Sequence, residues 1–91
     1  MNNAKLIYKK NLLIKNKINT INYYITADLD SFLDEDSCPY GIKVEKNNGE
    51  KYILKNKFSS YEKAKTLLTT LAKYKVTPII CDDVIEDLLK K

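Results

Sequence analysis

The stretch from Pro39 to Phe58, PYGIKVEKNNGEKYILKNKF, decides the fold that we expect for this chain. Two runs rich in β-branched and aromatic residues flank Asn47-Asn48-Gly49, a pattern that indicates a β-hairpin. A two-residue loop at Asn48-Gly49 would divide the apolar side chains between both faces, whereas a three-residue loop with a left-handed Gly49 gathers them on one face. We therefore predict the three-residue loop. Its cross-strand pairs are Lys46 with Glu50, Val44 with Tyr52, Ile42 with Leu54 and Tyr40 with Asn56.

The opposite face of this hairpin is basic. Its candidate interaction surface consists of Lys43, Lys51, Lys55 and Lys57, together with Tyr24 from the preceding strand. Such a surface suits an acidic protein or a phosphate backbone, and it equally suits a solvated face whose lysines discourage aggregation. Single-stranded nucleic acids usually stack on several aromatic residues. Because Tyr24 is the one aromatic residue that we place on this face, a protein is the preferred partner.

Upstream of the hairpin, the row NYYITADLD from Asn22 to Asp30 alternates as a half-buried strand does. We place Tyr23, Ile25, Ala27 and Leu29 on its apolar side. The next segment, SFLDEDSC, is predicted to be an acidic loop. Residues 1–18 are rich in Lys, and they fit an added edge strand and a loosely held basic arm equally well.

Downstream, Ser59 and Glu62 have the spacing of a capping box, and a helix over about residues 60–74 is predicted to cover the apolar face of the hairpin. Its apolar stripe is Tyr61, Ala64, Leu67, Leu68, Leu71 and Ala72. Thr77-Pro78 should end this region, because the residue before proline avoids the helical conformation. We then expect a short edge strand at residues 79–81 and a closing helix capped by Asp82 or Asp83.

These elements predict an α+β fold: a three-stranded antiparallel β-meander covered on one face by a helix, then a short edge strand and a short C-terminal helix. Residues 19–91 form a single α+β domain in this prediction, preceded by the undecided segment 1–18.

Composition removes several classes of function. The chain has 91 residues, a formal net charge of +4 and no His, so it lacks the usual general base, zinc ligand and imidazole-dependent triad. Cys38 and Cys81 stand far apart and are predicted to be free thiols, and no cofactor is expected. No apolar run approaches the roughly 18 residues of a membrane span. We expect a cytoplasmic protein with no membrane partner.

Four acids near the C-terminus form a candidate acidic surface: Asp82, Asp83, Glu86 and Asp87. On a helix, Asp83 lies three and four residues before Glu86 and Asp87, which brings these carboxylates within a turn of one another, and oxygen ligands suit Mg²⁺ or Mn²⁺. The alternative is that they are cap residues and the wet face of an amphipathic helix. Because position alone accounts for all four under that alternative, we predict no metal site and no catalytic residue.

Three segments carry a family resemblance: YYI at 23–25, YGIKVEK at 40–46 and KVTPIICDDVIEDLL at 75–89. Over roughly residues 20–90 the chain resembles a family of small proteins from spore-forming Firmicutes, known as a domain of unknown function. The resemblance implies no activity and no catalytic residues.

The resulting hypothesis is a small non-enzymatic regulatory or interaction protein that acts through protein–protein contacts. A phage or mobile-element inhibitor of a host system is one variant of it, and a homodimer is compatible with it. The alternative is a nucleic-acid-binding protein that uses the Lys-rich outer face of the hairpin. A third hypothesis is a metal-dependent enzyme at the C-terminal acids.

Overall fold

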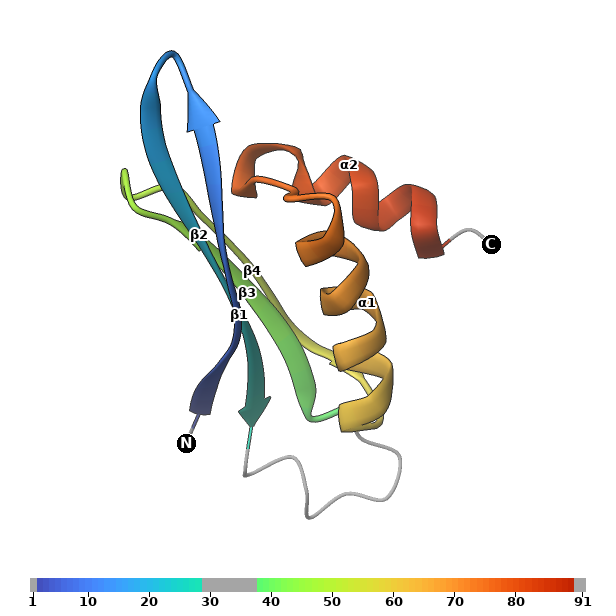
Figure 1. The fold of residues 1–91 in the computed structure, drawn as a ribbon. Coiled ribbons are helices and arrows are strands. Elements are labelled where there is room, and N and C mark those ends of the chain that lie inside the picture. The colour runs from blue at the N-terminus through green and yellow to red at the C-terminus, as the bar shows by residue number, and fades with distance from the viewer. Residues whose placement is uncertain (1, 29–37, 90–91) are drawn as a thin grey trace.

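The computed structural model describes residues 2–28 and 38–89. Within these residues an antiparallel sheet, with its strands in the order β1-β2-β3-β4, lies under two helices (Figure 1). The elements are β1 (Asn2–Ile14), β2 (Lys17–Asp28), β3 (Tyr40–Lys46), β4 (Lys51–Phe58), α1 (Tyr61–Lys73) and α2 (Pro78–Leu89). Both helices cover the same face of the sheet, called here the inner face. The α+β class is as predicted.

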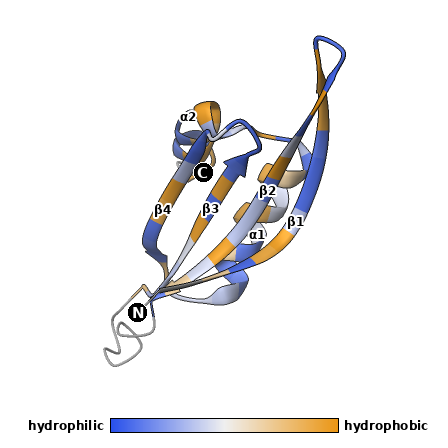
Figure 2. Cartoon of the chain, turned by 90° about the vertical axis from the view of Figure 1, so that its left-hand side faces the viewer, coloured by the Kyte–Doolittle hydropathy of each residue, from blue (hydrophilic) through white to orange (hydrophobic). Residues whose placement is uncertain are grey.

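The sheet has four strands, so the prediction of three strands plus a short edge strand is wrong. The additional strand is β1, which resolves the open choice for residues 1–18. It pairs with β2 from Asn2 opposite Asp28 to Ile14 opposite Lys17. The turn between them uses Lys15 and Asn16, both left-handed with φ values of 49° and 66°. Positive φ at both turn residues matches the twist of a hairpin, and this hairpin extends beyond β3 and β4 (Figure 2).

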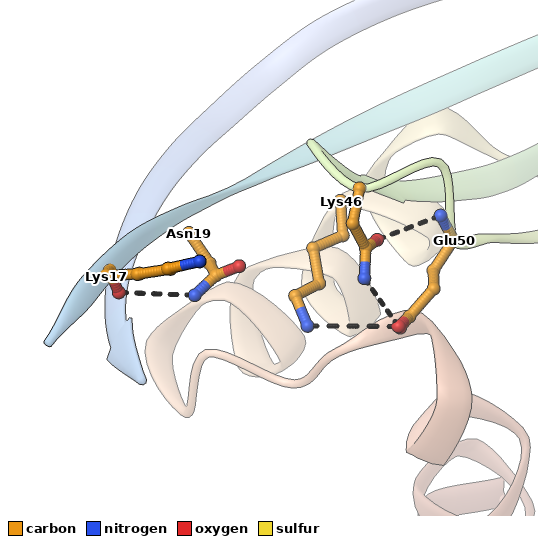
Figure 3. Close-up of polar contacts among 5 residues, drawn as sticks. Lys17, Asn19, Lys46 and Glu50 are labelled. Carbon is orange, nitrogen blue, oxygen red and sulfur yellow. Dashed lines mark hydrogen bonds and ion pairs between the residues drawn. The ribbon is translucent and has the colours of Figure 1, made fainter. Parts of the chain in front are cut away.

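The predicted three-residue loop between β3 and β4 is confirmed. Val44 pairs with Tyr52 and Ile42 with Leu54, while Gly49 has a φ of 96°. The side chain of Asn48 closes the turn: its Oδ1 accepts a hydrogen bond from the Glu50 backbone N at 3.0 Å, and its Nδ2 donates to Glu50 Oε1 at 2.7 Å (Figure 3). Such local bonds are the reason that Asn favours turns.

One predicted pair is wrong, because Tyr40 lies opposite Phe58 rather than Asn56. Between this pair and Ile42–Leu54, residues 55–57 of β4 bulge against Gly41 alone. Asn56 stands in the left-handed region with a φ of 51°, which Asn tolerates better than most residues. The bulge lets Phe58 reach the inner face, where it is buried.

Helix α1 buries the predicted stripe, and Tyr61 packs against its edge. The predicted capping box is off by one residue. Ser60 is the N-cap, and its hydroxyl accepts a hydrogen bond from the Lys63 backbone N at 3.2 Å. Ser59 Oγ instead accepts a hydrogen bond from Lys63 Nζ at 3.3 Å, so the two serines contact different atoms of Lys63.

Helix α2 corrects two predictions. Residues 79–81 are not a strand, and neither Asp82 nor Asp83 is a cap, because the helix already begins at Pro78. Proline suits the first helical position, where its missing N–H would have no partner inside the helix and its φ is already helical. With this start, Cys81 and Ile85 fall on the buried side of α2. Among the described residues, no helix is long and apolar enough to cross a membrane.

The core lies between the inner face and the helices. Tyr23 and Ile25 are buried, as predicted, whereas Leu29 and nearly all of the predicted acidic loop fall outside the described residues. Tyr23 is fully buried, and its hydroxyl donates to the Val76 carbonyl oxygen at 2.9 Å. At the other edge, Tyr8 Oη and Thr69 Oγ1 lie 2.8 Å apart and tie β1 to α1. The helices are thus fixed over one face, and the other remains uncovered by any described element.

Candidate functional site

The outer face of the sheet is the side opposite the helices (Figure 2). One row of side chains crosses all four strands on this face. Leu6 pairs with Tyr24, and Tyr24 pairs with Lys43. Lys43 in turn pairs with Ile53. These four residues, Leu6, Tyr24, Lys43 and Ile53, are called the outer row.

The outer row is apolar at both ends and aromatic and basic in its middle. Leu6 is 48% exposed and Ile53 46% exposed, so both aliphatic side chains are open to solvent on this face. Lys43 Nζ lies 5.2 Å from the centroid of the Tyr24 ring, within range of a cation–π contact. This contact holds the aliphatic part of Lys43 across the sheet, so the row presents a continuous amphipathic strip.

The next row along the strands is charged. Lys9 pairs with Asn22, Asn22 with Glu45, and Glu45 with Lys51. Glu45 Oε2 lies 3.7 Å from Lys43 Nζ and 4.0 Å from Lys51 Nζ. Solvent-exposed ion pairs contribute only about 0–1 kcal/mol each. The single negative charge of Glu45 is shared between two lysines. The charged row, which also contains Lys9, therefore remains basic beside the outer row.

On the other side of the outer row the side chains are small. Ala4 pairs with Thr26, and Thr26 with Gly41, which leaves a hollow of about 190 Å³. The bulge of β4 forms its rim, and Asn56 Nδ2 donates to Asp28 Oδ2 there at 3.3 Å. The residues around the hollow are Ala4, Thr26, Ala27, Asp28, Lys43, Ile53, Lys55 and Asn56.

Gly41 is required at the floor of this region. A Cβ on Gly41 would overlap the carbonyl oxygen of Leu54 and lie 2.8 Å from Thr26 Oγ1. Distances below 3.0 Å to a Cβ atom essentially do not occur, so any side chain here would push β4 away from β3. The bulge and the hollow therefore depend on one glycine.

The predicted interaction surface is partly brought together. Lys43 and Lys55 both line the hollow, and Lys51 stands in the charged row. Lys57 is exposed within the bulged segment and does not line the hollow. Sequence reasoning missed Leu6 and Ala4, because their place depends on the pairing of β1. The exposed pair Leu13 and Ile18, each 68% exposed at the end of the β1–β2 hairpin, was missed for the same reason.

The predicted acidic surface lies on the other side of the molecule. Asp82, Asp83, Glu86 and Asp87 are all exposed on α2. Asp82 Oδ1 accepts a hydrogen bond from Tyr52 Oη at 3.5 Å. Burial, and next the charge of Asp82, raise the pKa of Tyr52. Among the described residues, no group of three or more His, Cys, Asp or Glu side chains is arranged to hold a metal ion.

Both cysteines are free thiols. Cys81 is completely buried, and this burial raises the pKa of its thiol to about 12. Since the thiolate is the nucleophilic form, Cys81 is an unreactive core residue at neutral pH. Cys38 is half-buried beside Pro39.

A second hollow, of about 490 Å³, lies between α1 and the end of α2. The hydroxyls of Thr66 and Thr70 both donate to backbone carbonyls one turn earlier, at 2.9 and 3.3 Å. The proton of each hydroxyl is thus donated within the helix. Phe58, Leu67, Leu88 and Leu89 give this hollow a mainly apolar lining.

Comparison with known protein families identifies a match over most of the chain. A family model described as "Family of unknown function (DUF6514)" matches residues 3–91. No curated protein and no solved structure matches the chain.

Proposed function

The chain belongs to the DUF6514 family, and we propose that it is a non-enzymatic interaction protein that binds the acidic surface of a protein partner. The binding surface in this proposal is the outer face of the sheet. The observation that carries it is the outer row, in which two exposed aliphatic side chains flank a Tyr–Lys pair across all four strands.

The residue types on this face support a protein partner. Interfaces combine an apolar centre with a polar rim, and here Leu6 and Ile53 lie beside Tyr24 with lysines along both sides. The hollow next to the row offers space for one side chain of the partner. The charge of Lys43, Lys51 and Lys55 favours a partner that is acidic around that side chain.

Three observations support a role without catalysis. The chain has no His, and Cys81 is held neutral in the core by its burial. The acids of α2 lie on an exposed helix face.

Nucleic acid is the competing partner class. Sheets that bind single strands commonly offer several stacking rings, while the outer row offers one ring and two aliphatic side chains. An aliphatic side chain has no stacking surface for a base, so the row favours a polypeptide.

The test is affinity capture from the native host with three forms of the protein. The first is wild type. The second changes Ile53→Ser, Lys51→Gln and Lys55→Gln on the outer face, where all three side chains are exposed. The third, Lys63→Gln with Lys65→Gln, removes the same charge from exposed positions on α1.

We expect a partner protein that binds wild type and the α1 variant and loses at least tenfold in affinity with the outer-face variant. Binding of the purified partner should weaken with salt, because exposed charges are screened. Equal capture by all three forms would contradict the proposal. Capture that disappears after nuclease treatment would instead support the nucleic-acid alternative.

The proposal includes the finer predictions made from the sequence. These are a regulatory role, inhibition of a host system by a phage or mobile element, a cytoplasmic location and an origin in spore-forming Firmicutes. An inhibitor of this kind would capture one host enzyme in a stoichiometric complex and reduce its activity.

A further inference from the structure

Charge is separated between two opposite sides of the molecule. On the helical side, α2 carries Asp82, Asp83, Glu86 and Asp87 and no basic residue between Pro78 and Leu89. On the sheet side, Lys9, Lys43, Lys51 and Lys55 outnumber Glu45 and Asp28 in the two rows and around the hollow described above. One chain therefore displays an acidic helix and a basic sheet face.

These two surfaces cannot meet within one copy. Helix α2 packs over β3 and β4 from the inner side, with Cys81 and Ile85 in the core. Asp82 is hydrogen-bonded to Tyr52 of β4, but the side of α2 opposite Cys81 and Ile85 points away from the sheet, and the outer face points in the opposite direction (Figure 1). Complementary charge on opposite sides favours a head-to-tail contact, in which each copy offers a different surface to each neighbour.

Apolar side chains accompany the charges on both surfaces. Ile79 is 71% exposed and Ile80 46% exposed in the first turn of α2, next to Asp82 and Asp83. On the sheet, Leu6 and Ile53 occupy the ends of the outer row. Isoleucines beside acids on one surface match aliphatic residues beside lysines on the other, so a contact would bury apolar area as well as pair charges.

We propose that a second copy of this chain is a partner of the outer face, and that it docks the exposed side of its α2 there. The proposal rests on the proposed function, because it uses the same sheet surface. The contact is heterologous: each copy offers a sheet to one neighbour and a helix to another.

The dimensions fit such a contact. A helix of 12 residues is about 18 Å long. The seven residues of β3 extend over about 23 Å, and four strands lie about 14 Å from first to last. One helix covers less than the roughly 800 Å² per partner of a standard stable interface. The association is therefore weak, dependent on concentration and sensitive to salt.

The experiment uses sedimentation velocity of the full chain over a range of concentrations, at low and high salt. The sheet variant is the outer-face variant described above. The helix variant changes Ile79→Ser, Asp83→Asn and Asp87→Asn, all exposed on α2. The α1 variant, Lys63→Gln with Lys65→Gln, has the same net charge as the sheet variant. Thermal melting checks that each variant is folded.

We expect wild type and the α1 variant to form dimers and larger species that dissociate at high salt. The sheet variant and the helix variant should each associate at least tenfold more weakly. An equimolar mixture of these two should form a 1:1 dimer that does not grow, because each copy then has one intact surface. A wild type that stays monomeric at low salt, or a mixture that stays monomeric, would overturn the inference.

The two experiments distinguish failure of this inference from failure of the proposed function. If wild type is monomeric while a host protein still needs the outer face for capture, only the second copy is ruled out. If neither a host protein nor a second copy depends on the outer face, the proposed function fails too.

Discussion

The hydrogen bond from Tyr23 to Val76 offers a quantitative test of how the helical layer is held on the sheet. Tyr23 is fully buried in β2, and its hydroxyl donates at 2.9 Å to a carbonyl oxygen in the connection between α1 and α2. The change Tyr23→Phe keeps the ring and removes the donor. The buried carbonyl then loses this partner, which costs about 1–3 kcal/mol.

For a domain of this size, 1 kcal/mol shifts the melting temperature by about 4–8 °C. A loss of about 2 kcal/mol therefore lowers it by about 8–16 °C. Tyr52→Phe is the matched control, since its hydroxyl lies 3.5 Å from Asp82 Oδ1 at a half-buried position. A bond of that length near solvent contributes less than about 0.5 kcal/mol.

The assay is unfolding by urea and by heat, monitored by circular dichroism. The slope of the free energy of unfolding against urea concentration is compared among the three proteins. An equal slope shows that unfolding exposes the same surface area in each protein. A change in the urea concentration at half unfolding then reports a change in stability. The reasoning is refuted if Tyr23→Phe melts within 2 °C of wild type, or if the two variants lose equal stability.

Three further predictions concern single residues. Gly41→Ala should cost more than about 3 kcal/mol in urea unfolding, because its Cβ overlaps the Leu54 carbonyl oxygen; a loss below about 1 kcal/mol would contradict the packing described here. Thiol labelling of single-cysteine variants should modify Cys38 at least a hundredfold faster than the fully buried Cys81, and equal rates would contradict that burial. The pKa of Cys81 is raised to about 12, so the folded state holds this proton more tightly than the unfolded state; stability should be constant below about pH 8.5 and fall above it by up to about 1.4 kcal/mol per pH unit for this group. The stability of the Cys81→Ala variant should fall less steeply than that of wild type over the same pH range.

The parts of the fold that could be predicted are those with one uninterrupted period. The β3–β4 register followed from alternation on both sides of Gly49, and the buried stripe of α1 followed from helical spacing. In β1 the alternation changes phase. Leu6 faces Tyr24 on the outer side, but Tyr8 faces Tyr23 on the inner side, because Ile7 is an extra residue in a bulge. A single period of two cannot describe such a strand, so residues 1–18 remained undecided.

The start of helix α2 was predicted wrongly for a different reason. Pro78 was interpreted as the end of the preceding region, whereas it is the first residue of the next helix. The short apolar run that follows it is compatible with a strand or a buried helical turn, and only the buried spacing of Pro78, Cys81 and Ile85 distinguishes the two. The candidate site could be predicted only in part. The sequence places Tyr24, Lys43 and Lys51 on the outer face, but the complete outer row also includes Leu6, whose position depends on the register of β1.

The construction of the sheet edges favours association through the face. An exposed edge strand offers unpaired backbone groups to other chains, and lysines and bulges at the edge discourage this pairing. Both edges have these features: β1 has a bulge at Ile7 and β4 has one at Asn56. The lysines of the edge strands are Lys5, Lys9 and Lys10 in β1 and Lys51, Lys55 and Lys57 in β4. On the outer face Lys9, Lys51 and Lys55 border Leu6 and Ile53, whose apolar area is open to solvent. Lysines of the edge strands therefore both oppose strand pairing and attract an acidic partner to the face. Neutralising Lys51 and Lys55 should weaken binding to the face, while the bulge at Asn56 still opposes pairing at the β4 edge.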